Sequence, residues 1–93
     1  MAKNKLTSVL MTERARRDLD YWSHSGNAKK IERINALIQS CLEDPLSGIG
    51  VPERLRFHDQ ATYSRRIDKT HRLVYRTEGK SLIIISARFH YEI

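Results

Sequence analysis

An unbroken apolar run near the C-terminus constrains the fold of this chain more than any other feature. Residues 82–85 read Leu-Ile-Ile-Ile, and a strand that is apolar on both sides is stable only inside a sheet whose two faces are covered. We therefore predict a central strand over residues 81–91. Glu78-Gly79-Lys80 precedes it as a three-residue hairpin turn, so the strand before the turn should be its antiparallel neighbour.

Further strands are predicted on either side of a central helical region. Residues 72–77 form the strand before the hairpin turn, and Leu55 and Phe57 begin a short one after a loop that contains Gly48, Gly50 and Pro52. Residues 6–11 form a first strand. Within residues 63–68 the side chains alternate, so that one side of a strand carries Tyr63, Arg65 and Ile67, and the other carries Ser64, Arg66 and Asp68.

Two amphipathic helices are predicted between residues 12 and 45. Thr12 can cap a helix that begins at Glu13, and its apolar stripe is formed by Ala15, Leu19 and Trp22. After a turn at residues 23–27, the second helix runs to Pro45. Its apolar face comprises Ile31, Ile34, Ile38, Cys41 and Leu42.

These elements predict one α+β domain over residues 1–93, with residues 1–6 as a flexible tail. A two-helix hairpin should pack on one face of a twisted, mainly antiparallel sheet. The opposite face should then carry the arginine-rich positions of the strands.

Positive charge is concentrated in the second half of the chain. The net charge is +6, and residues 54–76 hold only two acidic side chains against seven basic ones, which are Arg54, Arg56, Arg65, Arg66, Lys69, Arg72 and Arg76. Clustered arginine is typical of a phosphate-binding surface. A solvated basic face, or one that pairs with an acidic protein, explains the charge about equally well.

Other classes of protein are disfavoured. Cys41 is the single cysteine, which excludes an intramolecular disulfide and favours a reducing compartment. No segment has the length of a membrane span, so we expect a cytoplasmic protein that does not bind membranes. The one cysteine and four scattered histidines lack the spacing of a metal site, and we expect neither a metal ion nor another cofactor.

Several residues of the basic half could cleave RNA without a metal ion, because RNA supplies its own nucleophile, the 2′-OH group. His90 is a suitable general acid near neutral pH. Glu53, which lies among arginines, is a suitable general base. Arg66 and Arg72 can bind phosphate oxygens, and Phe89 and Tyr91 can stack on bases.

The ordinary structural interpretations of these residues remain strong. A histidine such as His90 is more often a structural residue, and a carboxylate such as Glu53 is more often one half of a salt bridge. His71 and Arg72 could be a pair that flanks a turn, and Cys41 is best explained as a small buried hydrophobe. Residue types and spacing by themselves indicate a nucleic-acid partner and no more.

The order of several motifs adds a more specific signal. Tyr21-Trp22 is followed by residues 44–55 (Asp-Pro-Leu-Ser-Gly-Ile-Gly-Val-Pro-Glu-Arg-Leu), 63–67 (Tyr-Ser-Arg-Arg-Ile), 71–75 (His-Arg-Leu-Val-Tyr) and 87–91 (Ala-Arg-Phe-His-Tyr). This series resembles the YoeB/Txe branch of the RelE-like toxins of bacterial type II toxin–antitoxin systems. The resemblance extends over about residues 9–91.

The resemblance implies a microbial-ribonuclease-like fold and a ribosome-dependent endoribonuclease that cleaves mRNA in the 30S A site. It implies Glu53 as general base, His90 as general acid, Arg72 as the transition-state arginine and Tyr91 as a tyrosine needed for activity. We assign RNA binding to Arg56, Arg65 and Arg66. The implied partners are a YefM-like antitoxin, the ribosome with mRNA, operator DNA in complex with the antitoxin, and a second copy of the chain.

The sequence departs from the family pattern in two places near these motifs. Glu92 and Ile93 follow the tyrosine at which family members typically end, and Ala61-Thr62-Tyr63 replaces a glycine-aromatic-tryptophan segment. Three other functions remain open: a non-catalytic module that represses an operator together with its antitoxin, a gyrase poison of the same fold, and a ribosome-associated basic protein. The gyrase poisons lack the Glu, Arg, His and Tyr set found here.

Overall fold

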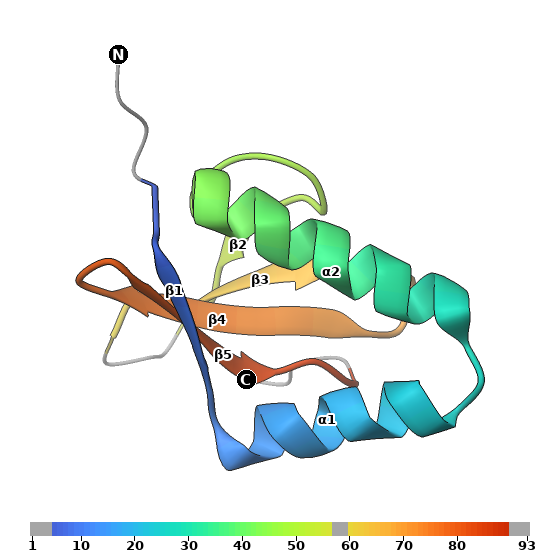
Figure 1. The fold of residues 1–93 in the computed structure, drawn as a ribbon. Helices are drawn as coiled ribbons and strands as arrows, with labels where there is room; N and C mark the ends of the chain where they lie inside the picture. The colour runs from blue at the N-terminus through green and yellow to red at the C-terminus, as the bar shows by residue number, and fades with distance from the viewer. Residues whose placement is uncertain (1–4, 57–59, 90–93) are drawn as a thin grey trace.

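A computed structural model describes residues 5–56 and 60–89 of the chain, and the elements are labelled in Figure 1. His90, Tyr91 and the predicted strand residue Phe57 lie outside the described residues. Seven elements follow one another along the chain: β1 (Ser8–Met11), α1 (Glu13–His24), α2 (Ala28–Glu43), β2 (Glu53–Arg54), β3 (Tyr63–Arg66), β4 (Arg72–Glu78) and β5 (Ser81–Ser86).

The strands form one five-stranded sheet in the order β1-β5-β4-β3-β2. β1 pairs with β5 in parallel, and the other three pairings are antiparallel. The apolar run therefore lies in an interior strand, as predicted. The α+β class and the mainly antiparallel sheet are confirmed.

The two helices form a hairpin on one face of this sheet (Figure 1). Thr12 caps α1, because its Oγ1 accepts a hydrogen bond from the Ala15 N–H at 3.1 Å. The same hydroxyl donates to the Ile85 carbonyl at 2.7 Å, which ties the start of α1 to β5. Asn27 caps α2, because its Oδ1 accepts a hydrogen bond from the Lys30 N–H.

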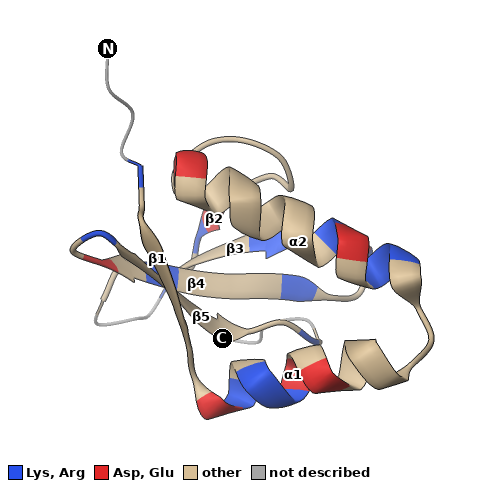
Figure 2. Ribbon diagram, in the orientation of Figure 1, with Lys and Arg blue, Asp and Glu red and all other residues tan. Residues whose placement is uncertain are grey.

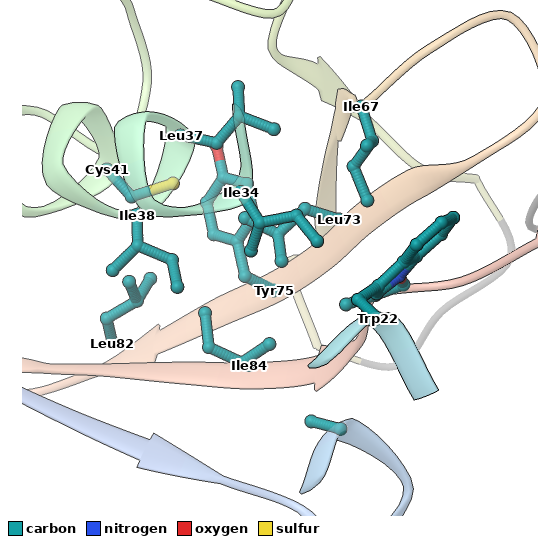
Figure 3. Close-up of a cluster of buried hydrophobic side chains, with 12 residues drawn as sticks. Trp22, Ile34, Leu37, Ile38, Cys41, Ile67, Leu73, Tyr75, Leu82 and Ile84 are labelled. Carbon is teal, nitrogen blue, oxygen red and sulfur yellow. The ribbon is translucent and has the colours of Figure 1, made fainter. Parts of the chain in front are cut away.

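The main core lies between the helices and the sheet (Figure 3). Trp22 of α1 and one face of α2 contact alternate residues of β4 and β5. Leu37 is fully buried in this core, although the sequence analysis did not place it on the apolar face. The buried cluster comprises Ala15, Trp22, Ile34, Leu37, Ile38, Cys41, Ile67, Leu73, Tyr75, Leu82, Ile84 and Ala87.

The predicted boundaries of β1, β3 and β4 are each wrong by one or two residues, and those of β2 and β5 are wrong as well. The short strand is Glu53–Arg54 and does not begin at Leu55. β5 ends at Ser86, whereas the prediction continued to residue 91. The physical reason is that α1 takes over the hydrogen bonds of the next peptide groups: the Ala87 N–H donates to Asp18 Oδ2 at 2.9 Å, and the Ala87 carbonyl accepts from Trp22 Nε1 at 2.8 Å.

Candidate active site

The open face of the sheet, opposite the helices, brings together side chains from three strands. Successive side chains of a strand point to opposite faces, so Leu73 and Tyr75 face the helices while Arg72 faces the other way. Arg66 is opposite Arg72 in the β3–β4 register, and Glu53 is opposite Ser64 in the β2–β3 register. The predicted arginine-rich face is therefore present. Figure 2 shows basic positions on β3 and β4, against mixed charges along α1.

An ion pair joins the two predicted catalytic residues of this face. Arg72 Nη1 lies 2.7 Å from Glu53 Oε1 and also donates to Ser64 Oγ at 3.0 Å. The Arg72 side chain is largely buried, whereas that of Glu53 is about half exposed. The hydrogen bond from Arg72, with further help from the charges of Arg72 and Arg66, lowers the pKa of Glu53. Glu53 is thus ionised and able to accept a proton, but it is a weak base while Arg72 holds it.

Arg66 and Arg56 are exposed on the described surface. The main chain of Arg66 is fixed on both sides: its N–H donates to the Gly50 carbonyl at 2.7 Å, and its carbonyl accepts from Arg33 Nη2 at 2.9 Å. Arg66 is opposite Arg72 in the register of β3 and β4, and its charge helps to lower the pKa of Glu53. An anion held by Arg72 would therefore be within the field of Arg66.

Arg65 requires a correction. It was assigned to RNA binding, but it is completely buried on the helix side of the sheet. All five of its N–H donors are used, with distances of 2.7–3.1 Å, so none remains for a phosphate. The acceptors are the Tyr75 and Ser40 hydroxyls and the carbonyls of Asp44, Ser47 and Ile49. The flanking Tyr63 and Ile67 were the signal in the sequence, since they mark the side of β3 that faces the core.

These bonds fold the loop between α2 and β2 around the Arg65 side chain. Gly48 and Gly50 have φ values of +120° and +87°, which favour glycine. A Cβ on Gly50 would lie 2.6 Å from Leu37 Cδ2 and 3.0 Å from Arg65 Cβ. Val51 has a φ of +53°, which is uncommon for a branched residue. The loop is therefore closely fitted, and it delivers the chain to Glu53.

A second fixed segment, residues 87–89, leads to His90. Ala87 is held by Asp18 and Trp22 of α1. The Phe89 N–H donates to His71 Nδ1 at 2.7 Å, and its carbonyl accepts from the Arg72 N–H at 3.2 Å. The residue before the predicted general acid is thus bonded to the main chain of Arg72. His90 and Tyr91 themselves lie outside the described residues.

Aromatic groups surround the same segment. The Arg88 guanidinium carbon lies 3.4 Å from the centroid of the Tyr21 ring and 4.4 Å from that of Phe89. Both rings are exposed, with 50% of Phe89 accessible. Arginine and aromatic faces of this kind suit unpaired bases. Neither Tyr21 nor Arg88 was singled out from the sequence as a site residue, and only their tertiary proximity distinguishes them.

Other chemistry finds little support among the described residues. Burial raises the pKa of the Cys41 thiol to about 11, so this cysteine is a poor nucleophile at neutral pH. In residues 5–56 and 60–89, no three His, Cys, Asp or Glu side chains are grouped so that they could hold a metal ion. The helices in the same part of the chain are too short or too polar to cross a membrane.

Comparison with known proteins identifies the family. A model of the YoeB-like toxins of bacterial type II toxin–antitoxin systems matches residues 11–91. The Toxin YoeB of Synechocystis sp. is 46% identical over 74 residues, which cover 78% of this chain and 86% of the relative. In a structure of the YoeB dimer from Staphylococcus aureus, one chain superposes with a TM-score of 0.82 at 34% identity, covering 94% of this chain and 99% of that one.

A third comparison concerns a toxin bound to its antitoxin. A chain from the heterotetrameric YoeB–YefM complex of Staphylococcus aureus superposes with a TM-score of 0.80 at 34% identity and covers 94% of this chain and 99% of its own. The family model spans most of the chain, and the relatives match along most of their lengths. The chain therefore belongs to the YoeB-like toxins of bacterial type II toxin–antitoxin systems.

Proposed function

We propose that this toxin is a metal-free endoribonuclease that cleaves mRNA in the A site of the 30S ribosomal subunit and thereby inhibits translation. The observation that carries the proposal is the Glu53–Arg72 pair on the open face, 2.7 Å apart, with the Arg72 main chain bonded to the residue before His90. The proposed general base, the Arg72 guanidinium and the residue that precedes the proposed general acid are thus close together.

Each group has a defined part in the reaction. Glu53 removes the proton of the 2′-OH group, and the 2′-oxygen forms a bond to the adjacent phosphorus. Arg72 stabilises the charge on the phosphorane-like transition state. The bond between phosphorus and the 5′-oxygen breaks, and His90 donates a proton to that oxygen. The products are a 2′,3′-cyclic phosphate and a 5′-OH end. Tyr91 contributes to the same site as a residue required for activity.

The ion pair of the free protein suggests how substrate binding prepares the base. A phosphate that enters the site competes with Glu53 for the Arg72 guanidinium. When Arg72 turns to the phosphate, Glu53 loses the hydrogen bond that lowers its pKa and becomes a stronger base. This change of partner by Arg72 links the binding of a phosphate to the activation of Glu53 as the general base.

The remaining surface and partners follow from the same proposal. Arg56 and Arg66 bind RNA phosphates, and Phe89 offers an exposed ring to a base. The chain forms a homodimer and is neutralised in the cytoplasm by a YefM-like antitoxin, and the toxin–antitoxin complex binds operator DNA. The YoeB dimer and the YoeB–YefM complex of a similar toxin support the two protein partners.

The test compares the parent with Glu53→Gln and His90→Gln, both in growing bacteria and on purified ribosomes that hold mRNA. We expect the parent to arrest growth and cleave the message, and each variant to react about 10²–10⁴-fold more slowly. Glu78→Gln is the matched control, because Glu78 is a carboxylate at the far end of β4 that contacts Arg76.

The proposal fails if either variant cleaves as fast as the parent. A parent that leaves ribosome-bound mRNA intact, while its antitoxin complex binds operator DNA, would instead support a non-catalytic repressor.

A further inference from the structure

Phe89 has a backbone conformation that neighbouring groups must hold in place. Its φ is +71°, a region that a bulky aromatic residue rarely occupies. Such a conformation persists when the surroundings fix it. Two hydrogen bonds to residues at the start of β4 or just before it do so: the Phe89 N–H donates to His71 Nδ1, and the Phe89 carbonyl accepts from the Arg72 N–H.

The imidazole of His71 is itself held firmly. Its ring meets the Trp22 ring edge-on, with centroids 4.9 Å apart and an interplanar angle of 87°. Its backbone N–H donates to Asp68 Oδ1 at 2.6 Å. Trp22 in turn holds the Ala87 carbonyl. The acceptor nitrogen of His71 therefore has a fixed position relative to both helix α1 and the segment that leads to His90.

The hydrogen bond also defines the chemical state of the ring. Nδ1 accepts from an amide, so it carries no hydrogen, and the proton of the neutral ring is on Nε2. A ring with both nitrogens protonated would set two donors against each other. In this arrangement His71 is neutral, and the lone pair of its Nδ1 is used by the Phe89 N–H.

From this geometry we infer that His71 is a positioning residue for the general acid His90. His90 directly follows Phe89 in the chain, so the position and direction of the Phe89 backbone determine where His90 begins. The Phe89 carbonyl also accepts a hydrogen bond from the Arg72 main chain, so the residue before the acid is fixed to the arginine that binds the phosphate. The inference deepens the proposed ribonuclease function and rests on it.

Two substitutions of His71 distinguish the effect of its hydrogen-bond acceptor from the effect of its aromatic ring. His71→Phe retains an aromatic ring against Trp22 but removes the acceptor. His71→Asn removes the ring, but its Oδ1 occupies nearly the place of Nδ1. We expect His71→Phe to lower kcat on ribosome-bound mRNA about 10–100-fold with KM changed less than about threefold, because the acid is displaced while Arg56 and Arg66, which bind the RNA phosphates, are unaffected. We expect His71→Asn to recover most of this loss.

Exchange of the Phe89 amide hydrogen provides a readout that does not require activity. In His71→Phe we expect this amide to exchange at least about tenfold faster than in the parent, with protection restored in His71→Asn. His24→Phe is the control, because His24 is an exposed histidine at the end of α1 whose Nδ1 contacts the Asp20 carbonyl. Both its kcat and its Phe89 protection should equal those of the parent.

Several results would overturn the inference. One is a kcat in His71→Phe equal to that of the parent, and another is an equal loss of kcat in His71→Asn and His71→Phe. A third is a nitrogen NMR spectrum of the parent that places the ring proton of His71 on Nδ1. The last measurement needs no variant and so does not depend on either one folding. If the parent cleaves no RNA, the ribonuclease proposal fails separately, while amide exchange still tests the hydrogen bond.

Discussion

The helix-covered face and the open face of the sheet each receive an arginine from β3, and the two side chains have opposite surroundings. Arg65 is buried, and oxygen acceptors of α2, the following loop and β4 use all of its donors. Arg66 is exposed beside the Glu53–Arg72 pair. The two neighbouring arginines therefore have different roles: Arg65 organises the loop before Glu53, and Arg66 contributes positive charge to the open face.

The largest expected effect comes from removing the buried arginine. Arg65→Met should lower the free energy of unfolding by about 4 kcal/mol, because several buried acceptors lose their donor and each unsatisfied group costs about 1–3 kcal/mol. Urea unfolding of the purified toxin measures the change. A loss this large is a substantial part of the stability of a small domain.

Arg66→Met is the matched control for that experiment. Its free energy of unfolding should differ from that of the parent by less than about 0.5 kcal/mol, since the hydrogen bonds of Arg66 that involve its main chain are retained. Equal losses in the two variants would remove the contrast between the two faces.

The next largest effect should appear at Arg72, the principal arginine of the open face. Arg72→Gln should reduce kcat for mRNA cleavage by about 10²–10³-fold, because a preorganised donor to the transition state is lost. Single-turnover cleavage on ribosomes measures this rate. Thermal unfolding should show that the variant is folded.

Arg54→Gln serves as the comparison for Arg72, because Arg54 is exposed and adjoins Glu53 on the other side of β2. Its kcat should remain within about threefold of the parent. A similar loss in both variants would indicate that general positive charge matters and that the position of Arg72 does not.

The smallest expected effect is on stability at low pH, and it comes from Asp68 in the turn that joins β3 to β4. Partial burial acts to raise the pKa of Asp68, but hydrogen bonds from Lys30 and from the His71 and Thr70 N–H groups prevail and lower it to about 2. The folded state therefore favours the ionised carboxylate. Its contribution to stability is complete above about pH 4, the unfolded value, and is lost as the pH falls toward 2.

Asp68→Asn should lower the free energy of unfolding by about 2 kcal/mol at pH 7, and it should flatten the decline between pH 4 and pH 2. Chemical unfolding at a series of pH values measures both. Lys30→Met should produce a smaller loss, because the two N–H donors to Asp68 remain. If the free energy of unfolding of Asp68→Asn fell between pH 4 and pH 2 as steeply as that of the parent, Asp68 would not be the group responsible for the decline.

The sequence predicted the fold class and the main elements because their signals are local. Helical spacing, the Thr12 cap and one apolar run were enough to define α1, α2 and an interior strand. The end of β5 was missed because the bonds that replace the strand ladder come from Asp18 and Trp22, far away in the chain. β2 was misplaced because two residues give almost no periodic signal.

For the candidate site, the sequence by itself determined which chemical groups are present and, through the alternation along β3 and β4, which of them share a face. Tertiary structure decided the rest. It selected the face that the helices cover, and so buried Arg65. It placed Glu53 against Arg72 across β3, and it directed the His71 ring nitrogen at Phe89. The physical reason is that alternation fixes only relative orientation within a strand, whereas burial, ion pairs and ring contacts depend on segments brought together by folding.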